Sequence, residues 1–143
     1  MTKRILKMAV SANGIGTSVV IYFNGLIVWQ GDPGVDPQKL NHEFEDVDNN
    51  EHTLLVEFSG KTHDHTKFNK QGEIISDLLV HIGDFFLDNI AISQLVWEKA
   101  KYYHDFNGSS SAIIDHVYGA MGCNGRVEFK FMSPVYLWLL ENT

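Results

Sequence analysis

Apolar and polar residues alternate with a period of two along several short stretches of this chain, the pattern of β-strands with one buried face. The alternation is clearest at 54–59 and 127–132, where leucine, valine and phenylalanine take every second position. Residues 17–24 and 26–30 are rich in β-branched and aromatic side chains, with Asn24-Gly25 between them. Asn and Gly tolerate best the positive φ angles of a type I′ turn, so this dipeptide predicts a β-hairpin.

Helical signals are few in comparison. Residues 109–118 could form one short helix with a serine N-cap and Gly119 at its end, and 135–140 could be a strand or a helical turn. Further strands are predicted at 4–10, 40–47, 78–81, 85–87, 91–98 and 101–104. Many short strands and at most one short helix predict one all-β domain over residues 1–143, a two-sheet antiparallel β-sandwich of jelly-roll type.

Composition and charge exclude several classes of protein and of binding partner. The 143 residues can bury one core without a disulfide, and Cys123 is the only cysteine. The formal charge is −7, of which −6 falls in residues 32–51, expected to be a solvated face or loop, so nucleic acid is not an expected partner. The longest apolar run, Val135 to Leu140, is too short to cross a membrane. Residues 2–7 are basic but lead into no apolar run of signal-peptide length, so we expect no signal peptide and no export by the ordinary route.

The polar segment 60–77 lies between predicted strands and carries possible metal ligands. His63 and His65 would point the same way in an extended segment, and His81 or a carboxylate could complete a transition-metal site. Calcium prefers hard oxygen ligands, for which the candidates are Asp64, Asp77, Asp84 and Asp88. No EF-hand spacing is present, so we expect no cofactor and leave calcium as an alternative.

Two sets of side chains are considered for nucleophilic catalysis. Cys123 lies in Gly122-Cys123-Asn124-Gly125, which is first of all a tight turn, and the serines at 109–111 are followed by Asp115 and His116. Neither set follows a known local signature. The chain is therefore not expected to be an enzyme.

Aromatic side chains offer flat apolar faces with polar edges, which match sugar rings. The candidates for glycan contacts are Trp29, Tyr102 and Tyr103. Sandwich cores also use aromatic residues, so burial is the alternative for each of them.

The apolar end of the chain could dock another subunit wherever it is not buried in its own core. The candidates for this docking are Tyr136, Trp138 and Leu140.

Four segments of the chain form a distinctive combination: GKTHDHT at 60–66, YHDFNG at 103–108, the glycine-rich 119–125, and SPVYLWLLEN at 133–142. Together they resemble a group of small uncharacterised proteins of tailed phages, especially T4-like phages of marine cyanobacteria. The resemblance covers most of the chain from about residue 17 onward. It implies a virion protein made in the host cytoplasm, and it brings no catalytic residues with it.

A second resemblance concerns the architecture. Two strands joined by Asn24-Gly25, followed by 52–58 leading into a polar loop, are similar to xylan-binding carbohydrate-binding modules with a jelly-roll sandwich. Some of those modules hold sugar hydroxyls through a calcium ion in a loop, which implies polysaccharide and calcium as possible ligands.

These observations favour a non-enzymatic structural or binding module of a phage particle, such as a capsid decoration, baseplate or tail component. Its expected partners are other virion proteins or further copies of the chain. The alternative is a calcium-assisted glycan-binding module, and a small hydrolase is less favoured.

Overall fold

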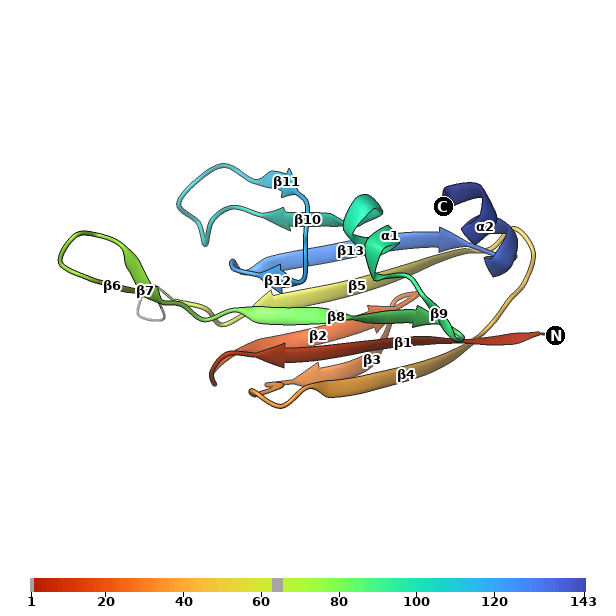
Figure 1. The fold of residues 1–143 in the computed structure, drawn as a ribbon, viewed down its shortest axis with the longest axis horizontal. Helices are drawn as coiled ribbons and strands as arrows, with labels where there is room; N and C mark the ends of the chain where they lie inside the picture. Colours follow the sequence, from red (N-terminus) through yellow and green to blue (C-terminus); the bar gives the residue numbers. More distant parts are fainter. Residues whose placement is uncertain (1, 63–65) are drawn as a thin grey trace.

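The structure is a computed structural model that describes residues 2–62 and 66–143. Its strands form two antiparallel sheets packed face to face, with a hairpin extending from one end and two short helices near the other (Figure 1). The predicted two-sheet β-sandwich is therefore confirmed.

Each sheet combines strands that are distant in sequence. One sheet has the order β12-β8-β1-β4, with β9 paired to β8, and the other has the order β11-β10-β13-β5-β2-β3. The strands of the first sheet are β1 (Lys3–Ala12), β4 (Gln38–Glu45), β8 (Val80–Leu87), β9 (Ile90–Ala91) and β12 (Ala120–Met121). Those of the second are β2 (Ser18–Phe23), β3 (Leu26–Gly31), β5 (Glu51–Ser59), β10 (Lys101–His104), β11 (Ile113–Asp115) and β13 (Gly125–Met132). Most connections carry the chain from one sheet to the other, as in a jelly-roll arrangement.

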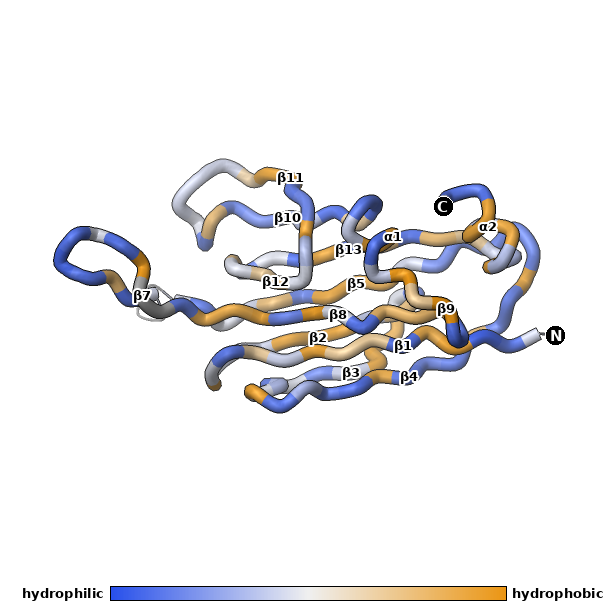
Figure 2. Tube along the Cα trace, viewed as in Figure 1, coloured by the Kyte–Doolittle hydropathy of each residue, from blue (hydrophilic) through white to orange (hydrophobic). Residues whose placement is uncertain are grey.

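The core lies between the two sheets and follows the period-two pattern. In β5, Leu54, Val56 and Phe58 are buried, while the residues between them are only half-buried. Apolar positions accordingly recur along the sandwich strands, whereas the hairpin of β6 (Lys67–Phe68) and β7 (Ile74–Ser76) is largely polar (Figure 2).

The hairpin predicted around Asn24-Gly25 is present between β2 and β3. Asn24 and Gly25 have φ angles of 50° and 83°, as a type I′ turn needs. The Asn24 side chain also ties this turn to β5, because its Oδ1 accepts the N–H of Thr53 at 2.8 Å.

The helices differ from the prediction in number and place. The segment predicted as a strand at 91–98 contains all but the last residue of α1 (Ser93–Lys99), and the ambiguous 135–140 lies within α2 (Val135–Asn142). Ile92, Leu95 and Val96 are all buried, and their spacing of three and four residues places them on one helical face.

The helix predicted at 109–118 is wrong, because this segment contains β11 paired with β10. The serines bond backwards to the preceding turn: Ser109 Oγ donates to the Phe106 carbonyl and Ser110 Oγ to the Asp105 carbonyl. Serine side chains used in this way hold a turn instead of capping a helix.

The buried side chain of His52 packs against aromatic rings of the core and also makes hydrogen bonds to two polar side chains. His52 is 4% exposed, and its ring centroid lies 4.8 Å from that of Phe44 and 5.1 Å from that of Phe131. Its Nδ1 accepts from the Asn24 amide at 3.0 Å, and its Nε2 donates to Ser133 Oγ at 2.9 Å. These partners suit the neutral ring, and burial lowers the pKa of His52.

The lowered pKa of His52 makes the stability of the fold dependent on pH. The unfolded chain gains a proton at this residue near pH 6.5, whereas the folded chain does so only at lower pH, so acidification favours unfolding. We expect the free energy of unfolding, measured in urea between about pH 7.5 and about pH 5.5, to fall by at most about 1.4 kcal/mol per pH unit from this site.

The variant His52→Gln should have a flatter pH dependence than the wild type. His116→Gln is the matched control, since it makes the same substitution at an exposed histidine outside the core. Equal slopes for the wild type and His52→Gln would contradict this role of His52.

Candidate functional site

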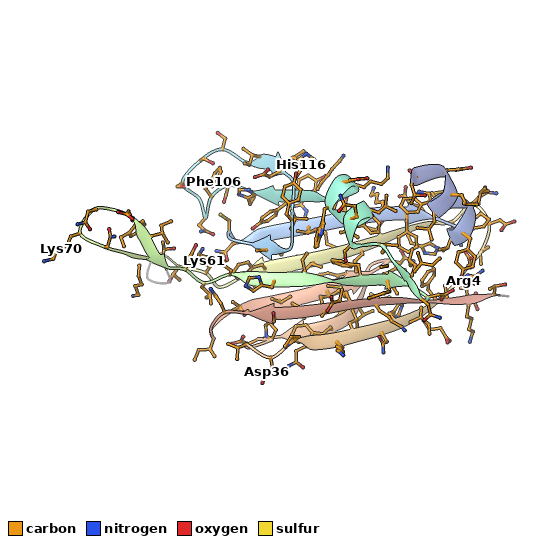
Figure 3. All side chains as sticks on the ribbon, viewed as in Figure 1. Arg4, Asp36, Lys61, Lys70, Phe106 and His116 are labelled. Atoms are coloured by element: carbon orange, nitrogen blue, oxygen red, sulfur yellow. The ribbon has the colours of Figure 1, made fainter. Side chains whose placement is uncertain are left out.

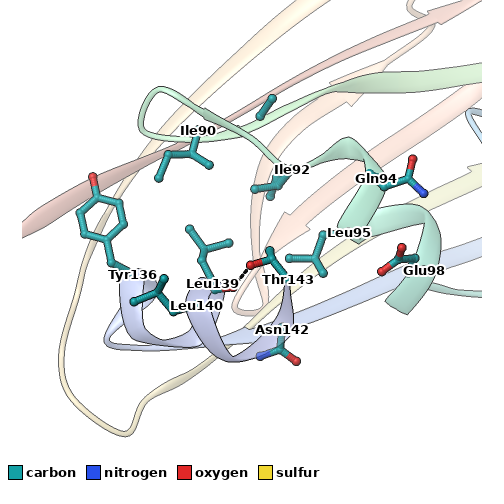
Figure 4. Close-up of a pocket in the computed structure, with 11 residues that line it drawn as sticks. Ile90, Ile92, Gln94, Leu95, Glu98, Tyr136, Leu139, Leu140, Asn142 and Thr143 are labelled. Atoms are coloured by element: carbon teal, nitrogen blue, oxygen red, sulfur yellow. Dashed lines mark hydrogen bonds between the residues drawn. The ribbon is translucent and has the colours of Figure 1, made fainter.

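An apolar groove of about 610 Å³ lies between α1 and α2 (Figure 4). Its walls carry large apolar side chains: Ile90, Ile92 and Leu95 on one side, and Tyr136, Leu139 and Leu140 on the other. Among the lining residues, Glu98 has the only carboxylate side chain, and none is a lysine, an arginine or a histidine. The groove can therefore bury apolar surface of a ligand beside the carboxylate of Glu98.

The apolar walls of the groove extend onto the surface of the protein. Leu140 is 77% exposed, and Leu137, Ile90 and Tyr136 are between 41% and 50% exposed. Single exposed apolar residues are common, but a contiguous patch next to a groove is typical of an interaction site.

The first turn of α2 is held by an acidic residue from a distant loop. Pro134 precedes the helix and provides no side-chain cap, but Asp46 Oδ1 accepts the N–H of Val135 at 3.1 Å. A carboxylate at this position satisfies a free backbone donor and complements the positive end of the helix dipole.

Arg4 links this cap to a second carboxylate. Its Nε donates to Asp46 at 3.1 Å and its Nη1 to Asp88 at 3.2 Å, at the end of the molecule where β1 begins (Figure 3). Tyr136 donates its hydroxyl hydrogen to Asp88 at 2.8 Å, and the Arg4 guanidinium lies 4.2 Å from the centre of its ring. These four residues, which we call the Arg4 cluster, fix the start of α2 against the sandwich.

The carboxylates of the Arg4 cluster remain charged in this environment. Burial alone would raise the pKa of Asp46, but hydrogen bonds from Ser133, Arg4 and the Val135 N–H together lower it. Burial likewise acts against ionisation of Asp88, and hydrogen bonds from the Ile5 N–H, Tyr136 and Arg4 lower its pKa.

Three side chains of α2 pack toward the sandwich, and one of them, Trp138, is an expected docking residue. Val135 is fully buried and Leu139 is 6% exposed. Trp138 is half-buried and lies edge-on to Phe129, with ring centroids 6.0 Å apart. Trp138 therefore helps to pack α2 onto the sandwich, while the other two docking candidates, Tyr136 and Leu140, line the groove.

The expected calcium aspartates do not converge. Asp77 pairs with Lys61 at 2.6 Å and Asp88 with Arg4, and Lys61 and Arg4 lie toward opposite ends of the sandwich (Figure 3). The eight residues of β8 separate the two aspartates by about 26 Å of extended chain.

Asp84 lies within β8, and Asp64, His63 and His65 lie outside the described residues. Over the part of the chain that the structure describes, no three His, Cys, Asp or Glu side chains are grouped so that they could hold a metal ion. The set of four aspartates is therefore not a joint site.

The three glycan candidates have different environments. Tyr102 is a core residue, only 5% exposed, and its hydroxyl bonds to the backbone of Cys123, so its ring is not open for stacking. Tyr103 is half-buried, and the guanidinium of Arg126 covers one face of its ring at 4.4 Å. Trp29 is half-buried and packs against the core.

The candidate nucleophiles also have structural roles. Burial raises the pKa of the Cys123 thiol, and the nearby Lys61 only partly opposes this effect, so the unreactive protonated form is favoured. The carboxylate of Asp115 lies 3.5 Å from Nε2 of His104. Its contact with His116 involves the backbone N–H of that residue and not the imidazole ring. No contact described in residues 2–62 and 66–143 joins the serines at 109–111 to His116 as nucleophile and base.

Sequence reasoning found one wall of the groove and missed the other. Tyr136 and Leu140 are docking candidates from the sequence, but Ile92 and Leu95 fall in the segment 91–98 that the pattern predicts as a strand, and Ile90 lies just before it. The available signal was the helical spacing of Ile92, Leu95 and Val96, a segment too short to distinguish the two periods.

Comparison with known proteins finds no matching family model, no matching curated protein and no matching solved structure. Within the described residues, neither helix has the length and apolar character needed to cross a bilayer.

The contacts of the Arg4 cluster predict how much the free energy of unfolding falls when its cation is removed. The Arg4 side chain is 21% exposed and that of Asp46 is 5% exposed, so Arg4→Met should leave a poorly solvated carboxylate and lower the free energy of unfolding by about 2 kcal/mol.

Lys3→Met is the matched control in the same strand, because Lys3 pairs with Glu43 where both side chains are more than half exposed. It should cost less than about 1 kcal/mol in the same urea titration. If both variants lose the same stability, the Arg4 cluster does not hold α2 as described.

Proposed function

We propose that this chain is a non-enzymatic structural or binding module of a phage particle, and that it docks another virion protein through the groove between α1 and α2. The observation that carries the proposal is the groove, an apolar surface built on a rigid sandwich and left open in the single chain. Localisation in the virion, as part of a capsid, baseplate or tail, belongs to the same proposal.

The chemistry of the groove favours a protein partner. Protein interfaces have an apolar centre and a polar rim, with aromatic and large aliphatic side chains at the centre. Here Tyr136, Leu140 and Leu95 are among the large side chains of the lining, and the lining also contains polar residues: Gln94, Glu98, Asn142 and Thr143.

The phage assignment draws on the resemblance of the four segments to small tailed-phage proteins. One of these segments, 133–142, contains nearly all of α2 and hence one wall of the groove. A small β-sandwich also suits a virion component, which is an argument from fold analogy.

The glycan alternative has less support. It needs exposed rings, whereas its three candidates are buried, half-buried beneath Arg126, or half-buried against the core. Two of the four aspartates proposed to bind its calcium ion, Asp77 and Asp88, pair with Lys61 and Arg4 at two separate places.

The test of the proposed function is incorporation into particles. We expect mass spectrometry to find the chain in purified particles of the phage that encodes it, and Leu140→Glu to reduce its incorporation by about tenfold or more, because a charge in the apolar groove must be desolvated on docking. Removing 134–143 would be a poorer test, since Val135 and Leu139 belong to the core.

Ile114→Glu is the matched control, because Ile114 is 63% exposed on β11 and does not line the groove. It should be incorporated like the wild type. Absence of the chain from the particles, or normal incorporation of a folded Leu140→Glu variant, would contradict the proposal.

A further inference from the structure

We propose that the occupant of the groove is an amphipathic helix of the partner protein, presenting two or three large apolar side chains flanked by lysine or arginine. This inference rests on the proposed docking function and specifies the partner's chemistry. It is argued from the dimensions of the groove and from its charge.

The dimensions of the groove match about two turns of helix. Its walls are α1, with seven residues, and α2, with eight, so each is about 10 to 12 Å long. A helix laid between them would place side chains at positions i, i+4 and i+7 along this length. The volume of about 610 Å³ lies in the range of pockets that enclose whole ligands, which leaves room for more than one large side chain.

The charge at the Glu98 end of the groove is negative, while at the Tyr136 end the cation of Arg4 is balanced by Asp46 and Asp88. Glu98 lines the groove, and Glu141 lies in the last turn of α2, where no basic residue balances the negative end of the helix dipole. The nearest lysines in sequence, Lys99 and Lys101, are not among the lining residues. Cations at the edge of the partner helix would complement Glu98, Glu141 and this helix end.

The same charge argues against a second copy of this chain as the occupant. Each copy carries a formal charge of −7, and a symmetric contact through the groove would bring together two surfaces that both have Glu98 in their lining and no basic residue. Such a contact supplies no cation to the groove and adds repulsion between like charges.

The test uses two synthetic peptides of about 14 residues with the same leucine positions at helical spacing, one with lysine and one with glutamate at its polar positions. Fluorescence anisotropy at about 0.15 M salt measures the affinity for the full chain, and circular dichroism measures the helix gained on binding. We expect the lysine peptide to bind and become helical, and the glutamate peptide to bind at least about tenfold more weakly.

Four variants separate groove binding from attraction to net charge. Leu140→Ser should weaken binding of the lysine peptide by about tenfold, and Glu98→Gln should weaken it by about threefold. The matched controls Ile114→Ser and Glu45→Gln remove an exposed apolar residue and an exposed acid outside the groove, and should bind like the wild type.

Three results would overturn the inference: equal affinity for both peptides, lysine-peptide affinity unchanged by Leu140→Ser, or a dimer in light scattering that Leu140→Ser abolishes. If Leu140→Glu is excluded from particles but the lysine peptide does not bind, the docking function stands and the basic helix is wrong. If the lysine peptide binds in the groove but the chain is absent from particles, the proposed function fails and the peptide specificity remains.

Discussion

The position of α2 depends on the pairing of Arg4 with Asp46 and Asp88. This one cation joins β1, the segment after β4 and the turn after β8, and the two carboxylates in turn receive the first N–H of α2 and the hydroxyl of Tyr136. A chain of hydrogen bonds continues from Asp46 through Ser133 and His52 to the turn at Asn24. Apolar packing of Val135 and Leu139 holds the helix down, but such contacts are not directional, so the polar cluster sets how the helix is turned. Its orientation decides that Leu140 and Tyr136 lie along the groove.

The helix α2 has two roles in this arrangement: its buried side chains pack on the sandwich, and its exposed apolar side chains form a wall of the groove. The buried lining residues Ile92, Leu95 and Leu139 belong to the core, whereas Tyr136 and Leu140 at the surface of the groove do not, so these two are free to be chosen for binding. Leu140 contributes little to folding at 77% exposure, and an apolar residue there has a physical purpose if another molecule covers it. The half-buried Trp138 and the fully buried Val135 keep the helix in place below that surface. The proposed docking function and the proposed basic helix both follow from this division between a buried and an open side of α2.

Local patterns in the sequence predicted the strands well and the helices poorly. The Asn24-Gly25 hairpin, β5 and β13 follow from turn chemistry and from alternation, both of which act over a few residues. The helix α1 is too short for its period to be recognised in the sequence. The segment that contains β11 has helix-like ends, but it forms a strand because it pairs with β10. The Arg4 cluster joins residues 42 and 84 positions apart, and no single-chain pattern identifies such partners. For the same reason two docking candidates predicted from the sequence, Tyr136 and Leu140, lie in the groove, while its opposite wall came only from the tertiary structure.

The claim that the groove between α1 and α2 is the binding surface is tested most directly by methyl NMR of the full chain titrated with the lysine peptide. The account predicts that the methyl signals of Leu140, Leu139, Leu95 and Ile90 shift together and saturate with the same affinity. The signals of Ile27, Leu55 and Ile114, which lie in β3, β5 and β11 outside the groove, should stay in place. Shifts confined to Ile27, Leu55 and Ile114, with the groove methyls unchanged, would contradict it.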